Sequence, residues 1–167
     1  PNHCLDLLDW QAKRFRGPKH LFRRTEVATA AQTVIETVQA QLEAIAHSPR
    51  RPAIALTAGR DTRMLVACSY PFRDSADYVT LMPPHQGDTD SVIARQLAEA
   101  AGLRHIPLPL QSAGPEARSA YIHRGGHCVS GRNASIHPSV AQLAHRHVFV
   151  GGTGGELSRG FLWNEAD

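Results

Sequence analysis

Residues 57–62, Thr-Ala-Gly-Arg-Asp-Thr, place two hydroxyls, one carboxylate and a glycine in a single short turn. The turn follows the apolar residues 53–56 and precedes a segment that can form a helix. Backbone N–H groups at a helix start, together with the helix dipole, bind anions such as phosphate. Thr57 and Thr62 add hydroxyl donors, and Asp61 is a candidate ligand for a divalent metal that bridges phosphates. The same residues also fit an ordinary strand-to-helix turn with threonine caps.

A second glycine-rich turn, residues 151–155, follows the apolar residues 147–150 near the C-terminal end of the sequence. Four of its five residues are glycines, which let a backbone approach a ligand closely or adopt positive φ angles. Taken alone, this segment is most simply a tight turn. Its interest comes from its pairing with the first loop.

The elements that must position these loops follow from periodicity and from turn residues. The alternation of apolar strands with helices predicts an α/β protein, a three-layer α/β/α sandwich with a parallel sheet and right-handed crossovers. We expect an extended lead-in over residues 1–24, a nucleotide-binding domain over 25–167 and a loop over 124–136. The expected helices are 25–47, 62–70, 90–101, 116–123 and 138–144, and the expected strands are 53–56, 78–82, 105–108 and 147–150. The first helix carries an apolar stripe that we expect to pack against the sheet, formed by Val27, Ala31, Val34, Val38, Leu42 and Ile45.

The first loop resembles the SGGxDS loop of the PP-loop ATP pyrophosphatases, in particular that of the asparagine synthetase branch. Thr57 and Thr62 stand in place of serines, and Ala58 replaces the first glycine. Residues 151–161 are similar to the second motif of that branch, SGxGxDELFGGY, but are one residue shorter and carry Glu156 in place of an Asp–Glu pair. Residues 88–105 resemble the family's helix after its second strand.

The resemblance implies a HUP or Rossmann-like sheet with strand order 3-2-1-4. In that order strands 53–56 and 147–150 are neighbours, and the sheet changes direction between them. Ligands of open α/β sheets bind beyond the carboxyl ends of the strands at such a switch point. Both glycine loops would then face one ligand.

The resemblance further implies ATP and Mg²⁺ as cofactors and a small carboxylate as the second substrate. The activity would be activation of the carboxylate by adenylation, release of pyrophosphate, and formation of an amide. Asp61 and Arg63 are the implied catalytic residues, and Asp61 and Glu156 the implied metal ligands. The implied nucleotide-binding residues are Leu56, Thr57, Ala58, Gly59, Arg60, Thr62, Thr80, Leu81, Gly151 and Gly152.

Residues 1–15 resemble the segment that joins a glutaminase-type domain to the synthetase domain in relatives of asparagine synthetase. The resemblance therefore implies that a parent protein carries such an N-terminal domain. The family's downstream lysine region would lie beyond Asp167, so we expect the domain to be incomplete at its C-terminal end.

Two alternative functions remain open. Ala58 and the shortened second loop favour a non-catalytic nucleotide-binding or interaction module. The basic cluster within residues 13–24 fits a PP-loop enzyme that modifies tRNA, although a solvated basic connector explains it more simply and nucleic acid is not an expected partner.

Composition and motif content exclude several other classes of function. The net charge is only +3, and no apolar stretch approaches the length of a membrane span, so no membrane partner is expected. Three widely spaced cysteines fit a reducing cytoplasm better than a disulfide framework. The sequence has no Walker A lysine, no GxSxG elbow and no paired CxxC zinc motif.

Overall fold

The computed structural model describes residues 3–6, 8–14, 25–84, 88–127, 129 and 131–152. The chain divides into two compact units, Pro1–Val34 and Ile35–Asp167. Among the described helices, none combines the length and the apolar character that a membrane crossing requires.

The first unit contains a short antiparallel hairpin of β1 (His3–Leu5) and β2 (Ala12–Arg14). We expected only an extended lead-in here, since strands of three residues are too short to show periodicity. The turn between the strands is held by two aspartates, whose carboxylates accept hydrogen bonds from backbone N–H groups two residues further on.

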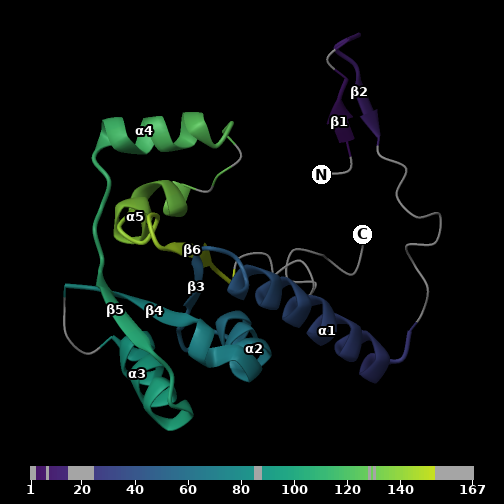
Figure 1. Ribbon diagram of the computed structural model, residues 1–167. Coiled ribbons are helices and arrows are strands. Elements are labelled where there is room, and N and C mark those ends of the chain that lie inside the picture. The colour runs from purple at the N-terminus through teal and green to yellow at the C-terminus, as the bar shows by residue number, and fades with distance from the viewer. Residues whose placement is uncertain are drawn as a thin grey trace, which may run out of the picture. The chain divides into compact units, whose positions relative to one another are not determined.

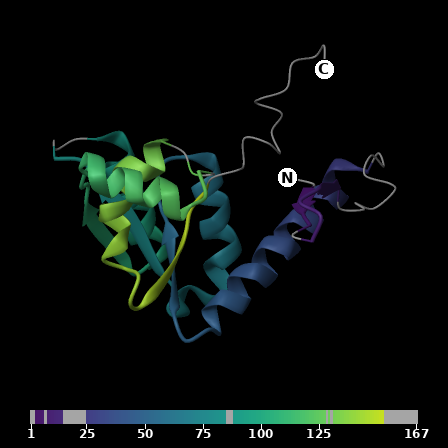
Figure 2. The ribbon, with the colours of Figure 1, turned by 90° about the horizontal axis from the view of Figure 1, so that it is seen from above.

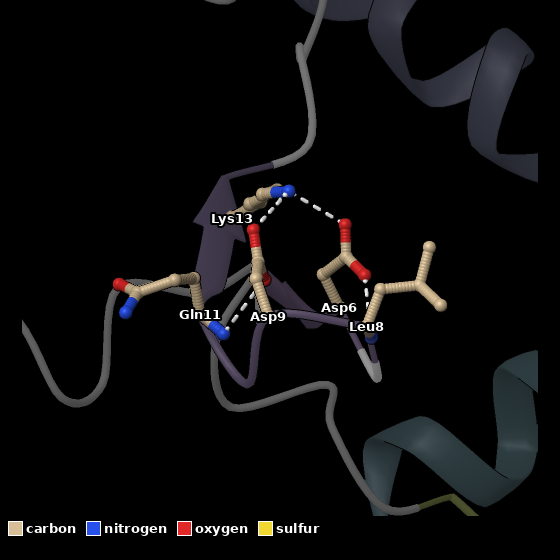
Figure 3. A network of polar contacts seen from close by, with 5 residues as sticks. All are labelled: Asp6, Leu8, Asp9, Gln11 and Lys13. Carbon is tan, nitrogen blue, oxygen red and sulfur yellow. Dashed lines mark hydrogen bonds and ion pairs between the residues drawn. The ribbon is translucent and has the colours of Figure 1, made fainter.

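Lys13 links these two aspartates (Figure 3). Its Nζ lies 2.6 Å from an Asp6 carboxylate oxygen and 2.8 Å from one of Asp9. The ammonium group holds the pKa of both carboxyls below their usual value, and the pKa of Lys13 is raised in turn. Because these groups are exposed, we regard the network as a local stabilisation of the turn.

The second unit is built on a four-stranded parallel sheet (Figure 1). Its strands are β3 (Arg51–Ala55), β4 (Asp77–Met82), β5 (His105–Pro109) and β6 (His147–Val150). They lie in the order β5-β4-β3-β6, which confirms the predicted order 3-2-1-4. The predicted contact between the first and last strands is also confirmed, with Ala53 opposite Phe149 and Ile54 opposite Val150.

Helices cover both faces of this sheet (Figure 2). The helices are α1 (Val27–Ala46), α2 (Arg60–Ser69), the 3₁₀ helix η1 (Tyr70–Ser75), α3 (Thr89–Ala101), α4 (Pro115–Arg124) and α5 (Gly131–Ala141). One apolar cluster joins Ile54 and Tyr78 of the sheet to residues of α1, α2 and α3. A second cluster joins Ala53, Val79 and Leu108 to Leu143, which follows α5. The three-layer α/β/α sandwich is thus confirmed.

The apolar stripe of α1 is buried only near the C-terminal end of the helix, contrary to our expectation for its whole length. Leu42 is 2% exposed, whereas Val34 is 47% and Val27 is 83% exposed. A helix of 20 residues is about 30 Å long. A strand of five residues such as β3 spans only about 17 Å.

The predicted boundary between a loop over 124–136 and a helix over 138–144 is wrong. Instead α5 runs from Gly131 to Ala141 with Pro138 inside it. Proline has no N–H to donate to the carbonyl four residues earlier, which here belongs to Ala134. The Nδ1 atom of His137 lies 3.1 Å from that carbonyl oxygen and can donate to it as the Nδ1–H tautomer, so the neighbouring side chain replaces the missing bond.

A buried carboxylate forms ion pairs with side chains at the amino ends of the other strands. Asp77, the first residue of β4, is 2% exposed. Its carboxylate oxygens lie 2.7 Å from Nε2 of His147, 3.0 Å from Nε of Arg104 and 3.8 Å from Nε of Arg51. Arg51 and His147 begin β3 and β6, and Arg104 precedes β5. This network was not predicted from the sequence, and it lies at the edge of the sheet opposite the glycine loops.

Candidate functional site

Two adjoining pockets lie at the carboxyl ends of β3, β4 and β6. Their volumes are about 540 and 360 Å³, within the range typical of small-molecule sites. Both are lined by Ala55, Thr57, Asp90, Arg132, Ile136 and Phe149. We refer to them together as the cleft, to the larger as the loop pocket, and to the smaller as the strand pocket.

The first predicted loop forms one wall of the loop pocket. Thr57 Oγ1 accepts a hydrogen bond from the Gly59 N–H at 3.0 Å and lies 2.9 Å from Thr62 Oγ1. Thr62 Oγ1 is also 3.1 Å from the Gly59 carbonyl oxygen. The two hydroxyls therefore brace the loop. Since α2 begins at Arg60 without a side-chain cap, the N–H groups of its first turn are the loop's main donors for an anion.

Asp90 is a site residue that the sequence did not reveal. Its carboxylate accepts a hydrogen bond from the Ala58 N–H at 3.0 Å, and it lines both pockets. The bond occupies one donor of the loop, the N–H of Ala58 itself. Two residues earlier, Asp88 accepts from the Ser91 N–H and caps α3.

The second glycine loop meets the first one. Gly151 and Gly152 line the loop pocket. A Cβ atom on Gly152 would lie 3.1 Å from Cβ of Asp61 and 3.2 Å from the backbone nitrogen of Thr62. Only glycine allows this close approach to the first turn of α2 without a displacement of the backbone. Residues 153–167, including the predicted metal ligand Glu156, lie outside the described residues.

Gly152→Ala should displace the second loop from α2 by a few tenths of an ångström, because both contacts fall inside ordinary van der Waals distance. We expect a several-fold loss of nucleotide affinity in titration calorimetry and a loss of about 1 kcal/mol in the free energy of unfolding. Gly114→Ala is the matched control, since a Cβ there meets no atom within 4 Å. Equal effects of the two substitutions on affinity would contradict the proposed contact.

Of the remaining predicted residues, some line the cleft and others do not. Thr80 and Leu81 line the strand pocket. Leu56 is 0% exposed and packs in the core, so it lines neither pocket. The side chains of Arg60 and Arg63 are exposed and line neither pocket, and Arg63 Nε donates to the Gly59 carbonyl at 3.4 Å.

Thr80 connects the strand pocket to a histidine. Its Oγ1 donates to the Leu56 carbonyl oxygen at 2.7 Å and lies 2.8 Å from Nε2 of His105. Since the hydroxyl proton is used on Leu56, His105 serves as the donor through Nε2–H. Burial lowers the pKa of His105, and the charge of Glu99 opposes this effect in part.

A lowered pKa makes the stability contribution of His105 dependent on pH. The unfolded chain binds a proton at this site more readily than the folded chain does, so the contribution is complete above about pH 6.5 and is lost as the pH falls below it. We expect urea titrations to give a lower free energy of unfolding at pH 5.5 than at pH 7.5. The decrease should be smaller in His105→Gln, and an equal decrease in both proteins would refute the assignment.

Arg132 and Asn133 reach the loop pocket from the start of α5, and sequence reasoning missed both. They fall in residues that we expected to form a loop, and no local pattern distinguishes them. Arg132 lines both pockets, and among the described residues it is the one guanidinium that does so. A delocalised cation at this place is suited to phosphate or carboxylate groups.

Two carboxylates, of Asp61 and Asp90, line the loop pocket. Within the described part of the chain, no group of three or more potential metal-ligating side chains is assembled. Magnesium commonly binds one or two carboxylates together with substrate phosphates.

Comparisons with known proteins find similarities among solved structures. No family model matches the chain, and no curated protein matches it. Among solved structures, the NH3-dependent NAD synthetase from Campylobacter jejuni subsp. jejuni NCTC 11168, in complex with the nitrate ion, is similar with a TM-score of 0.49 and 11% sequence identity. The similarity covers 83% of this chain and 62% of that one, so the chain spans less than two thirds of that structure's length. The fold assignment stands on the strand order and layers of the chain itself.

Proposed function

We propose that this domain binds ATP with Mg²⁺ and activates a carboxylate by adenylation for amide formation, as its sequence motifs suggest by their resemblance to the asparagine synthetase branch of the PP-loop proteins. One observation carries the proposal. The two glycine loops leave neighbouring strands and meet in one cleft, with Gly152 against the first turn of α2. A switch point of a parallel sheet is where such a ligand binds.

Different residues of the cleft would contact the phosphates, the base and the metal. The N–H groups of the first turn of α2, together with Gly151 and Gly152, hold phosphates, and Arg132 balances their charge. The strand pocket receives the adenine base beside Thr80 and Leu81. Asp61, with Asp90 close by in the loop pocket, would hold magnesium, which supplies charge neutralisation as pyrophosphate leaves.

The proposed reaction has two displacement steps. A carboxylate oxygen of the substrate attacks the α-phosphorus, the bond to the bridging oxygen breaks, and pyrophosphate leaves with the electron pair. An amine then attacks the acyl carbon, AMP leaves, and the amine proton passes to solvent or a base. The cleft contributes by orienting the reactants and by presenting fixed N–H dipoles and cations to the developing charge.

Titration calorimetry with ATP, in the presence and absence of Mg²⁺, tests the binding step. Release of pyrophosphate with aspartate and other small carboxylates then tests turnover. Magnesium-dependent binding followed by pyrophosphate release supports the synthetase. Binding without release supports the non-catalytic nucleotide module, which is favoured by one observation: Asp90 already occupies the Ala58 N–H. Absence of ATP binding would reject both.

A further inference from the structure

The charged residues of α4 and α5 are basic except for Glu116 in the first turn of α4. No aspartate or glutamate occurs between residues 117 and 152, whereas four arginines do. All four are exposed: Arg118, Arg124, Arg132 and Arg146. The nearest carboxylate is Glu116 in the first turn of α4, where it complements the helix dipole.

Two of these arginines connect the layer to the cleft. Nη2 of Arg118, on α4, lies 3.2 Å from the position that a Cβ on Gly131 would occupy. Gly131 begins α5 and directly precedes Arg132, which lines both pockets. Among the described residues, no carboxylate forms an ion pair with either guanidinium. The two cations are therefore available to an external anion.

An open hollow of about 840 Å³ runs along α4, and Arg118 is part of its lining. Its lining combines Arg118 with two exposed histidines, His123 and His127, whose rings meet edge to face at a centroid distance of 6.0 Å. Ile122 adds apolar surface, and Glu116 lies at one end of the helix. We call Arg118, His123, His127 and Arg132 the basic strip.

We propose that the basic strip binds an acidic polypeptide segment and presents one of its carboxylates to the cleft. This inference rests on the proposed function, which requires a substrate with a carboxylate. It goes further in stating that the carboxylate belongs to an extended chain with acidic neighbours. The positive charges of Arg118 and Arg132, and the place of Arg118 beside Gly131 at the start of α5, carry the argument.

A polypeptide fits this surface better than a nucleic acid does. Single-stranded nucleic acids bind where aromatic side chains offer free faces to the bases. The phenol ring of Tyr121, on α4, is already stacked on His137 at a centroid distance of 4.5 Å. A nucleic acid also has no carboxylate for the cleft to activate.

Fluorescence anisotropy with a labelled peptide of alternating Glu and Gly tests the proposal on the 167-residue chain. The control ligand is the same peptide with Gln in place of Glu. We expect the acidic peptide to bind more tightly than the Gln peptide, and its affinity to fall as salt is added. Arg118→Gln should weaken it roughly threefold, and the double variant with Arg132→Gln about tenfold or more, in line with exposed and partly desolvated charge pairs.

Arg95→Gln is the matched control, because Arg95 is an exposed arginine on α3, on the opposite face of the sheet. Thermal melting of each variant monitors folding. Equal binding of the Glu and Gln peptides, or an equal loss in Arg95→Gln, would overturn the proposal. So would tighter, Arg118-dependent binding of a single-stranded RNA, which would assign the strip to nucleic acid.

Titration of ATP and Mg²⁺ on the same preparation separates this inference from the proposed function. If ATP binds and the two peptides do not differ, the inference falls and the proposed function stands. If the acidic peptide is preferred but ATP does not bind, the substrate role of the segment falls together with the proposed function.

Discussion

Asp61→Asn should lower the magnesium-dependent affinity for ATP by at least about tenfold, which corresponds to ~1.4 kcal/mol. The carboxylate lines the loop pocket at the start of α2, and an amide is a much weaker ligand for magnesium than a carboxylate. Calorimetric titrations with Mg²⁺ and with a chelator measure the difference directly. The affinity in the chelator should change little, since the substitution removes a metal ligand and keeps the backbone donors.

The melting temperature distinguishes this role from a structural one. A carboxylate in the first turn of a helix stabilises it by only about 0.3–1 kcal/mol, so the Asp61→Asn variant should melt near the parent. Asp74→Asn serves as the control, because Asp74 is an exposed aspartate in η1, just before β4 begins at the amino edge of the sheet. A large loss of stability with unchanged nucleotide affinity would show that Asp61 caps the helix and holds no metal.

Asp77→Asn is expected to cost about 2–4 kcal/mol of the free energy of unfolding. Removing one partner of a buried ion pair typically costs about 3–5 kcal/mol. We place the expected effect lower because two of the cations, Arg104 and Arg51, are 59% and 39% exposed at their side chains and regain hydration when the charge is lost. Urea unfolding monitored by circular dichroism measures the change.

The same substitution should leave ATP affinity unchanged wherever the variant is folded. Asp77 begins β4, whereas the cleft lies at the opposite ends of the strands. Arg104→Gln, which removes only the more exposed partner, should cost less than Asp77→Asn. A cost of under about 0.5 kcal/mol for Asp77→Asn would indicate that the network contributes little, as surface ion pairs do.

The strands and their parallel pairing could be predicted from the sequence because their signals are local, whereas the strand order came from the resemblance of the loops to a known family. Each of the four strands is a short apolar run next to a turn, and helices between them impose parallel pairing. The start of α5 could not be predicted in this way. Pro138 suggested a helix beginning there, but a contact from His137 supports a proline inside the helix.

The residues of the site can also be separated into those set by local sequence and those set by long-range contacts. Thr57, Gly59 and Thr62 belong to one turn, so their grouping follows from the sequence. Leu56 was assigned to the nucleotide, yet successive side chains of a strand point to opposite sides, and while Ala55 lines the cleft, Leu56 enters the core. Asp90 and Arg132 reach the cleft from α3 and α5, and only the tertiary structure reveals such long-range contacts.

A crystal structure of the chain with Mg²⁺ and a non-hydrolysable ATP analogue tests the central claim most directly. The account predicts phosphates between the first turn of α2 and Gly151–Gly152, magnesium at Asp61, and the base beside Thr80 and Leu81. A nucleotide bound elsewhere, or phosphates that contact only one of the two glycine loops, would contradict the claim that these loops form a single site.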